Sequence, residues 1–146
     1  MTVFSFDRQL RFGDCDPSGI AYFPSYLNIL NGVVEEFWSR IGFPWQDLIT
    51  GRRIGTPTVH LTCDFSRPSV FGDLLTFKLR IGRVGGASLH LTHAVFGRDV
   101  VRWKARQVVA ATSLAHHRSM PWPEDILSAL VAHLHGDDQD GAAVAR

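Results

Sequence analysis

This sequence has few cysteines, no long apolar run and no excess of charge of either sign. Two cysteines in 146 residues permit at most one bridge, which argues against a disulfide-rich secreted scaffold. No apolar stretch approaches the ~18 residues of a membrane span, and the first twelve residues lack the continuous apolar segment of a signal peptide. Fifteen basic and fourteen acidic residues create no field that would attract nucleic acid or an anionic membrane. We therefore expect a cytoplasmic protein with neither nucleic acid nor membrane as a partner.

The common metal-binding and catalytic motifs are also missing. The seven histidines include no helical i, i+4 pair, and His90 and His93, three apart in a predicted strand, point to opposite faces. There is no Cys-x-x-Cys pair, no Gly-x-Ser-x-Gly nucleophile elbow and no glycine-rich phosphate loop between a strand and a helix. Cys15 lies between Asp14 and Asp16, whose charges should raise the pKa of its thiol. We therefore expect no metal site and a packing role for Cys15.

The chain has the size and apolar content of one globular domain. Its 146 residues are 45% hydrophobic, and a chain of this length buries roughly 70% of its unfolded surface. The sequence shows no internal repeat and no linker, so residues 1–135 are predicted to form a single domain. Residues 136–146 are predicted to form a flexible polar tail.

Alternating apolar and polar residues predict five strands. In the first three strands the apolar residues share one parity: Phe4, Phe6, Leu10 and Phe12; then Val59, Leu61, Cys63 and Phe65; and then Leu75, Phe77, Leu79 and Ile81. Two more strands run from about Ser88 to Phe96 and from Val100 to Ala111. Turn signals at residues 71–73, 85–86 and 97–99 predict that the last three strands form an antiparallel meander.

A long helix is predicted from about Pro24 to Ile41. Pro24 suits a first helical turn, and Gly42 suits the stop. Apolar residues cover most of the circumference of this helix, so other structure should largely enclose it. A short amphipathic helix is expected from Pro123 to about Leu134. The order of one strand, a long helix and four strands predicts an α+β fold, in which the helix packs on the concave face of an antiparallel sheet.

Asp14 and Asp16, in the turn-rich stretch before the long helix, are the remaining candidates for chemistry. Pro17 biases Asp16 away from the helical region, which places its carboxylate in a turn. In a structural interpretation, both carboxylates bond local backbone amides. In a catalytic interpretation, a carboxylate near a helix N-terminus acts as nucleophile or base on a carbonyl, while backbone amides and the helix dipole stabilise the oxyanion. A thioester is the natural electrophile, because its thiolate leaves easily.

The run Phe12-Gly13-Asp14-Cys15-Asp16-Pro17-Ser18-Gly19-Ile20, followed by Tyr22-Phe23-Pro24-Ser25-Tyr26, closely resembles the hot-dog fold acyl-CoA thioesterases. Within that family it is most similar to the 4-hydroxybenzoyl-CoA thioesterase subfamily. Gly55-Thr56-Pro57, the Gly72-Asp73 turn and Ser88 extend the resemblance, which covers about residues 4–112. The resemblance implies a five-stranded antiparallel sheet wrapped around one long central helix. It also implies homodimers or homotetramers whose sheets join edge to edge, with active sites at the subunit interface.

The resemblance assigns roles to individual residues. It implies that Asp16 is the catalytic carboxylate and that the backbone amide of Phe23 polarises the thioester carbonyl. The residues that it places against the substrate are Tyr22, Pro24, Tyr26, Asn31, Thr56, Pro57 and Ser88. It implies no cofactor and no metal, since coenzyme A is part of the substrate.

Two positions depart from the family pattern. Hydroxybenzoyl-specific members carry an aspartate where this chain has Asn31, which leaves benzoyl or another substituted aryl group open. Some relatives hold the coenzyme A phosphates with a basic cluster where this chain has Gly85-Gly86-Ala87. Five other basic residues could replace this cluster: Arg80, Arg83, Lys104, Arg106 and Arg118. Each of them also fits the ordinary role of a charged side chain in solvent.

Other polar residues favour structural roles. His93 and Gln107 fall on the apolar faces of their strands and suit satisfied core groups better than pocket-lining ones. Glu35 and Glu36 fall on the polar stripe of the long helix, which suits surface charges.

Together these features predict an enzyme that hydrolyses an aromatic or short acyl-CoA thioester, with Asp16 as nucleophile or general base. A thioesterase for carrier-protein thioesters and a non-catalytic acyl-CoA-binding module are the alternatives. A hot-dog dehydratase is disfavoured, because residues 13–41 contain no histidine. An unrelated α+β fold acting as a structural partner would be favoured by a monomeric protein, since the hot-dog site is built between subunits.

Overall fold

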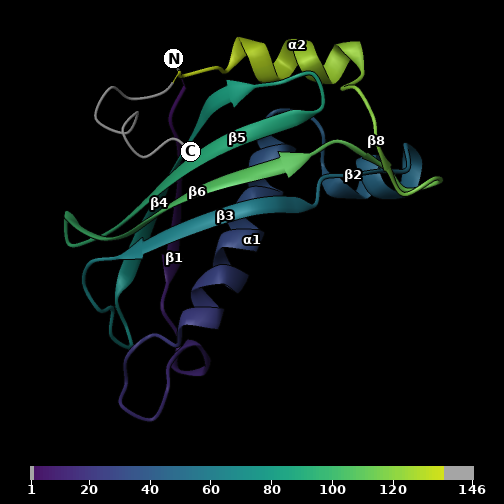
Figure 1. Ribbon diagram of the computed structural model, residues 1–146. Coiled ribbons are helices and arrows are strands. Elements are labelled where there is room, and N and C mark those ends of the chain that lie inside the picture. The colour runs from purple at the N-terminus through teal and green to yellow at the C-terminus, as the bar shows by residue number, and fades with distance from the viewer. Residues whose placement is uncertain (1, 137–146) are drawn as a thin grey trace.

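A five-stranded antiparallel sheet and one long helix dominate the computed structural model, which describes residues 2–136 (Figure 1). In spatial order the strands are β1 (Phe4–Gln9), β4 (Leu74–Val84), β5 (Ser88–Gly97), β6 (Val100–Ala110) and β3 (Thr58–Phe65). Helix α1 (Phe23–Arg40) packs on one face of the sheet, and the short helix α2 (Glu124–Ala132) contacts β4. The predicted α+β architecture is confirmed, including the meander of β4, β5 and β6. Apart from Gly136, the predicted tail lies outside the described residues.

Side chains at alternate positions of the central strands form the core together with α1. On β5, every second residue from Leu89 to Gly97 is buried. The buried side chains of α1 are Tyr26, Leu30, Val33, Val34, Phe37 and Trp38. Full burial of each large apolar side chain contributes about 1.5–3 kcal/mol, so this face of α1 fixes the helix against the sheet.

Helix α1 begins and ends within one residue of the prediction. Pro24 lies in the first turn, where its missing N–H breaks no helical hydrogen bond. Gly42 has a φ of +99°, a left-handed conformation that ends the helix without strain on a side chain. The helix is less enclosed than predicted: Leu27 and Ile29 are only half-buried, and Asn31 is exposed.

The extension of the first predicted strand to Phe12 is wrong, and the apolar face of β3 is exposed. β1 ends at Gln9, and Phe12, in the 3-10 turn η1 (Phe12–Asp14), is 77% exposed. The turn breaks the two-residue alternation on which the prediction depended. β3 is an edge strand, and its Val59, Leu61 and Phe65 are 61%, 37% and 49% exposed. An edge strand has a neighbour on only one side, so its apolar face is not covered within this chain.

A second, three-stranded sheet was not predicted. It consists of β2 (Ile54–Gly55), β7 (Thr112–Ser113) and β8 (Arg118–Ser119), and it follows a π-helical turn, η2 (Gln46–Gly51). Strands of two residues are too short to show a periodicity.

Replacing Phe37 by alanine should destabilise the fold strongly. Phe37 is fully buried, and its ring meets Phe4 edge-on with centroids 5.0 Å apart. We expect a loss of about 3–5 kcal/mol in the free energy of unfolding, measured by urea denaturation. The matched control is Phe12→Ala, which should lose less than about 1 kcal/mol because that ring is exposed. Equal losses in the two variants would contradict this description of the core.

Candidate active site

Residues 10–22, called here the Asp16 loop, connect β1 to α1 through a tight turn. Cys15 and Ala21 form a β-bridge, and the Asp16 amide donates to the Ile20 carbonyl at 2.9 Å. The Gly19 amide donates to the Asp16 carbonyl at 2.9 Å, and Gly19 has a φ of +79°, which other residues rarely adopt. The backbone of Asp16 is therefore fixed on both sides.

Ser18 holds the carboxylate of Asp16. Oδ1 accepts hydrogen bonds from the Ser18 amide, at 2.8 Å, and from the Ser18 hydroxyl. The hydroxyl bond, and then the amide bond, lower the pKa of Asp16 below the ordinary aspartate value. Asp16 is only half-buried, so its carboxylate is accessible to a substrate or a water. Asp16 is thus ionised at neutral pH, the state in which a carboxylate attacks a carbonyl or accepts a proton.

Asp14 has a structural role in the same loop. Its Oδ2 accepts a hydrogen bond of 2.8 Å from the Arg11 amide, which closes η1. Its carbonyl accepts the Tyr22 amide at 2.9 Å, directly before α1 begins. Both carboxylates therefore bond local backbone amides, as the structural interpretation predicts, and the carboxylate of Asp16 is in addition accessible to solvent.

At the N-terminus of α1, the backbone amide of Phe23 is a candidate hydrogen-bond donor to a substrate. Phe23 is the first residue of the helix, so its amide has no acceptor in a preceding turn. Pro24 has no N–H, and the Ser25 amide donates to the Tyr22 carbonyl at 2.8 Å. The helix dipole adds partial positive charge here, so the Phe23 amide is suited to bind a carbonyl oxygen or an oxyanion.

Arg102 and Asp73 order the neighbouring 66–73 loop. Arg102 Nη1 lies 2.8 Å from Asp73 Oδ2, and the two side chains are only 11% and 10% exposed. The same Nη1 donates to the Pro68 carbonyl at 3.1 Å and to the Ser69 hydroxyl at 3.3 Å. Burial raises the pKa of Asp73, but the hydrogen bonds from the Val70 amide and Arg102 outweigh it and bring the pKa below the ordinary value.

The 66–73 loop in turn holds the Asp16 loop by backbone hydrogen bonds. These bonds run from Ala21 N to Ser69 O (2.9 Å), Phe71 N to Gly19 O (3.0 Å), Gly72 N to Leu10 O (2.9 Å) and Leu10 N to Asp73 O (2.7 Å). The position of Asp16 therefore depends on a loop that is distant in sequence.

An aromatic pocket of 290 Å³ opens where the Asp16 loop, α1 and the end of β3 meet. Phe23, Tyr26 and Phe65 line it, and Arg67 lies at the same opening. The rings of Tyr26 and Phe65 stack with centroids 5.8 Å apart, and Trp103 lies 5.1 Å from Tyr26. A wall of stacked aromatic rings suits a flat apolar acyl group.

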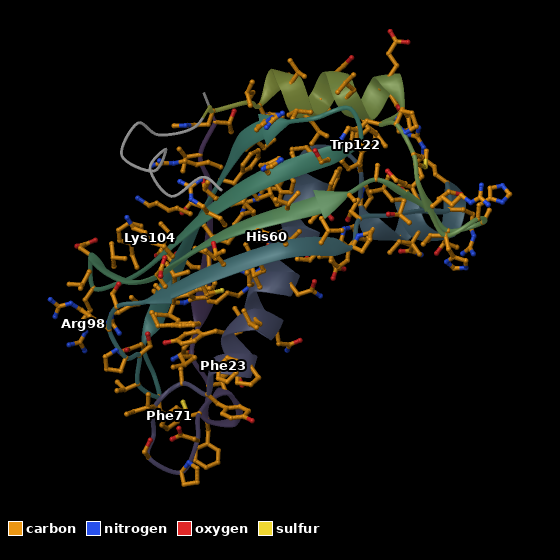
Figure 2. All side chains as sticks on the ribbon, viewed as in Figure 1. Phe23, His60, Phe71, Arg98, Lys104 and Trp122 are labelled. Atoms are coloured by element: carbon orange, nitrogen blue, oxygen red, sulfur yellow. The ribbon has the colours of Figure 1, made fainter. Side chains whose placement is uncertain are left out.

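The predicted site residues occupy both ends of β3. Those at the end with the aromatic pocket are Asp16, Tyr22, Phe23, Pro24 and Tyr26. Thr56 and Pro57 lie at the other end, where the Pro57 carbonyl accepts the Ala110 amide at 3.1 Å. Ser88 pairs with Ala110, and its carbonyl accepts the Trp122 indole N–H at 3.0 Å. Figure 2 shows Trp122 at the opposite end of the molecule from Phe23 and Phe71.

One chain therefore does not bring all predicted site residues together. The eight residues of β3 span about 24 Å from Thr58 to Phe65. Asn31 is exposed on α1, and eight helical residues place it roughly 12 Å along the axis from Phe23.

Other candidate residues have structural roles. His93 Nε2 and Gln107 Oε1 are 2.9 Å apart in the core, and Gln107 donates to the Thr58 hydroxyl at 2.8 Å. Burial lowers the pKa of His93 to about 4. Burial, and then the charges of the nearby aspartates, raise the pKa of Cys15, so its thiol is not activated. Glu36 pairs with Arg8 and Arg40 at the surface.

Residues 2–136 contain no group of three or more histidine, cysteine, aspartate or glutamate side chains that could bind a metal ion. In the same part of the chain, no helix has the length and apolarity needed to cross a membrane.

Sequence reasoning missed three residues that shape the pocket and its loops. Arg102 falls on the polar parity of β6, where a solvated arginine gives the same pattern. The alternation of β3 places Phe65 on a strand face without indicating the pocket, and no sequence pattern distinguishes Arg67 from a solvated arginine. The glycine at position 97 is the sequence feature that reflects the position of Arg102. A Cβ atom added to Gly97 would lie 2.7 Å from the Arg102 guanidinium, so a larger residue would displace it.

Comparisons with known proteins agree with this geometry. Residues 10–130 match the family model described as the thioesterase-like superfamily. A 1,4-dihydroxy-2-naphthoyl-CoA hydrolase of Nostoc punctiforme is 31% identical over 120 residues, which cover 81% of each chain. A 4-hydroxybenzoyl-CoA thioesterase of Pseudomonas sp. is 32% identical over 90 residues, 60% of this chain and 64% of that protein. The solved structure of a gentisyl-coenzyme A thioesterase matches with a TM-score of 0.78 at 26% identity, over 88% of this chain and 99% of that one. The predicted family resemblance, hot-dog fold and enzyme class are confirmed.

Removing the Ser18 hydroxyl should raise the pKa of Asp16. The hydroxyl donates to the charged carboxylate, so Ser18→Ala destabilises the ionised form and moves the titration of Asp16 to higher pH. Carbon-detected NMR titration of the Asp16 carboxyl group measures this shift directly. An unchanged pKa of Asp16 in Ser18→Ala would show that the hydroxyl does not hold the carboxylate.

Proposed function

Because the chain belongs to the thioesterase-like superfamily and is a thioester hydrolase, we propose that it hydrolyses an aromatic acyl-CoA thioester to the free acid and coenzyme A. One observation carries this proposal: Ile20 and Ala21 of the Asp16 loop line the same aromatic pocket as Phe23, the first residue of α1. The names of two relatives support it, since 1,4-dihydroxy-2-naphthoyl-CoA and 4-hydroxybenzoyl-CoA both carry an aromatic acyl group. The hydrolysis needs no cofactor and no metal.

In the proposed reaction, the acyl ring lies against Tyr26 and Phe65, and the thioester carbonyl oxygen accepts a hydrogen bond from the Phe23 amide. The charge that develops on this oxygen is stabilised by the amide and by the helix dipole. In this arrangement the carboxylate of Asp16 faces the reacting carbon. The aromatic wall also excludes water from one side of the bound thioester, which strengthens these electrostatic interactions.

Two routes use the same groups. As a nucleophile, Asp16 attacks the carbonyl carbon and expels the coenzyme A thiolate, forming a mixed anhydride that water then hydrolyses to restore the carboxylate. As a general base, Asp16 takes a proton from the water that attacks the carbonyl, and the thiolate leaves and is protonated. Label in Asp16 after a single turnover in ¹⁸O-labelled water would establish the nucleophilic route, because only attack of water on the aspartyl carbonyl of the anhydride transfers the label to Asp16.

The proposed active unit is a homodimer, alone or within a homotetramer, formed along the edge of β3. The pocket lies at the Phe65 end of β3, whereas Thr56 and Pro57 lie at the Thr58 end. Antiparallel pairing of β3 with its copy, centred on the middle of the strand, would bring the Thr58 end of one chain to the Phe65 end of the other. This pairing would also cover the exposed apolar residues of β3, and the partner's Thr56 and the partner's Pro57 would complete the pocket.

Asp16→Asn should remove most of the activity. Asparagine keeps the shape and an acceptor for Ser18 but is neither a nucleophile nor a base at neutral pH, so we expect kcat to fall at least ~100-fold. The measurement is thiol release from benzoyl-CoA and 4-hydroxybenzoyl-CoA. Asp14→Asn is the matched control and should keep kcat within about threefold, because an amide oxygen can still accept the Arg11 amide.

Near-normal turnover by Asp16→Asn would remove Asp16 from the mechanism. Tight binding of these thioesters by the wild type without thiol release would favour the acyl-CoA-binding module instead.

A charge on the β3 edge should dissociate the dimer. Val59→Lys would place like charges on the paired edges, at a side chain that is 61% exposed in one chain. We expect the mass from light scattering to fall to that of the monomer, and thiol release to fall with it. Gln9→Lys, on the opposite edge strand β1, is the control and should change neither. A wild-type protein that is itself monomeric and active would contradict the proposed assembly.

A further inference from the structure

Three hydrogen-bonded side chains cross the sheet from the core of β5 to the edge strand β3. His93 Nε2 lies 2.9 Å from Gln107 Oε1, and Gln107 Nε2 donates to the Thr58 hydroxyl at 2.8 Å. His93 and Gln107 are 3% and 7% exposed, whereas Thr58 is exposed. These three residues, called here the Thr58 network, connect the buried layer of the sheet to its open edge (Figure 1).

The Thr58 network occupies positions that otherwise carry apolar side chains. Its neighbours on the same faces of β5 and β6 are buried apolar residues: Leu91, Val95, Ala105 and Val109. An imidazole and an amide in such a layer cost free energy unless they are hydrogen-bonded, and apolar side chains would avoid that cost. The packing of the sheet therefore does not require these polar residues, and a function for them is to be sought at the exposed end of the network.

The protonation of His93 sets the direction of the hydrogen bonds. Burial lowers the pKa of His93 to about 4, so the ring is neutral at neutral pH and only one of its nitrogens carries a proton. Nδ1 has no hydrogen-bond partner among the described residues, and a buried N–H donor without an acceptor is costly. We therefore place the proton on Nε2, which donates to Gln107 Oε1. The Gln107 amide donates to Thr58, and the hydroxyl of Thr58 keeps its own proton for an outward hydrogen bond.

Thr58 and Phe65 lie on the same face of β3, at its two ends. Thr58 bonds the buried side chain of Gln107, and the Phe65 ring stacks on Trp103 with centroids 5.4 Å apart. Trp103 and Gln107 are four residues apart on β6 and both buried, so their side chains share one face of the sheet.

The proposed dimer brings Thr58 to the aromatic pocket of the partner chain. The middle of β3 lies on the two-fold axis, and Thr58 and Phe65 are equally far from that middle. Since paired strands are about 4.8 Å apart, Thr58 of one chain lies beside the partner's Phe65, which lines the partner's pocket.

We propose that the Thr58 hydroxyl selects the acyl group bound in the partner's pocket, by donating a hydrogen bond to an oxygen substituent on its ring. This proposal rests on the proposed function, which supplies the dimer and the aromatic thioester. Stacked aromatic rings hold a flat group but do not fix its rotation in the ring plane. One donor at a fixed position orients a ring that carries an acceptor, and this donor loses its bond when the ring has none. Gln107 and His93 are positioning residues, because they direct the hydroxyl and touch no substrate.

Thiol release from benzoyl-CoA and from the ring isomers of hydroxybenzoyl-CoA tests this assignment. The readout, called here the selectivity ratio, is kcat/KM for the best hydroxybenzoyl isomer divided by kcat/KM for benzoyl-CoA; a loss of folded protein does not change it. Thr58→Val keeps the shape of the side chain and removes the donor, so we expect the selectivity ratio to fall about tenfold. Thr58→Ser restores a hydroxyl and should recover most of the ratio.

Two more variants separate the network from the rest of the strand. Gln107→Met should lower the selectivity ratio less than Thr58→Val, because the hydroxyl remains but loses its fixed direction. Thr62→Val is the matched control: Thr62 lies on the same strand but on the opposite face, so the ratio should be unchanged.

Mixed dimers, isolated through two different affinity tags, test whether Thr58 acts across the interface. In a dimer of a wild-type chain with an Asp16→Asn/Thr58→Val chain, the variant chain supplies position 58 to the only pocket that keeps Asp16. The selectivity ratio should then equal that of Thr58→Val. A dimer of an Asp16→Asn chain with a Thr58→Val chain should show the wild-type ratio, with one working site per dimer.

A selectivity ratio unaffected by Thr58→Val, or an equal fall in Thr62→Val, would overturn the proposal, as would mixed dimers with the reverse pattern. In each of these cases aromatic thioesters are still hydrolysed, so the proposed function stands. If the wild type releases no thiol from benzoyl-CoA or from any hydroxybenzoyl isomer, the proposed function fails, and the assignment of Thr58 fails with it.

Discussion

The buried ion pair between Arg102 and Asp73 is the interaction on which the candidate site depends. It lies under the 66–73 loop, and the same guanidinium also bonds the Pro68 carbonyl and the Ser69 hydroxyl. A buried pair of this kind contributes little if both partners are replaced by well-packed apolar groups, but removing one partner costs about 3–5 kcal/mol. Gly97 is part of the same arrangement, because any side chain there would displace the Arg102 guanidinium.

The ion pair acts on Asp16 only through the backbone. Arg102 and Asp73 make no described contact with the Asp16 carboxylate; they order the 66–73 loop, which bonds the Asp16 loop at Leu10, Gly19 and Ala21. Ser18 then orients the carboxylate itself. A reactive side chain on a loop needs this support, because small displacements of a nucleophile or base reduce the rate steeply.

The sequence was sufficient for the large elements and for the location of the Asp16 loop. Helix α1 could be predicted because Pro24 and Gly42 mark its ends, and the meander because its alternation is long and its turns contain glycine. The exposure of Phe12 and of β3 could not be predicted, because alternation shows which residues share a face but not whether that face is covered. Arg102 could not be recognised either: its role depends on the distance to Asp73, which only the folded chain sets. The separation of Thr56, Pro57 and Ser88 from Asp16 is a property of the topology rather than of any motif.

The most direct test of this dependence is kcat for Asp73→Asn, a residue that touches neither the acyl group nor Asp16. The variant should be assayed for thiol release from both benzoyl-CoA and S-benzoyl-pantetheine, after circular dichroism has shown that it is folded at the assay temperature. If the ion pair positions Asp16, kcat should fall about tenfold or more with both substrates, including the one that lacks the nucleotide. A wild-type kcat with S-benzoyl-pantetheine in the folded variant would contradict the central role of this ion pair.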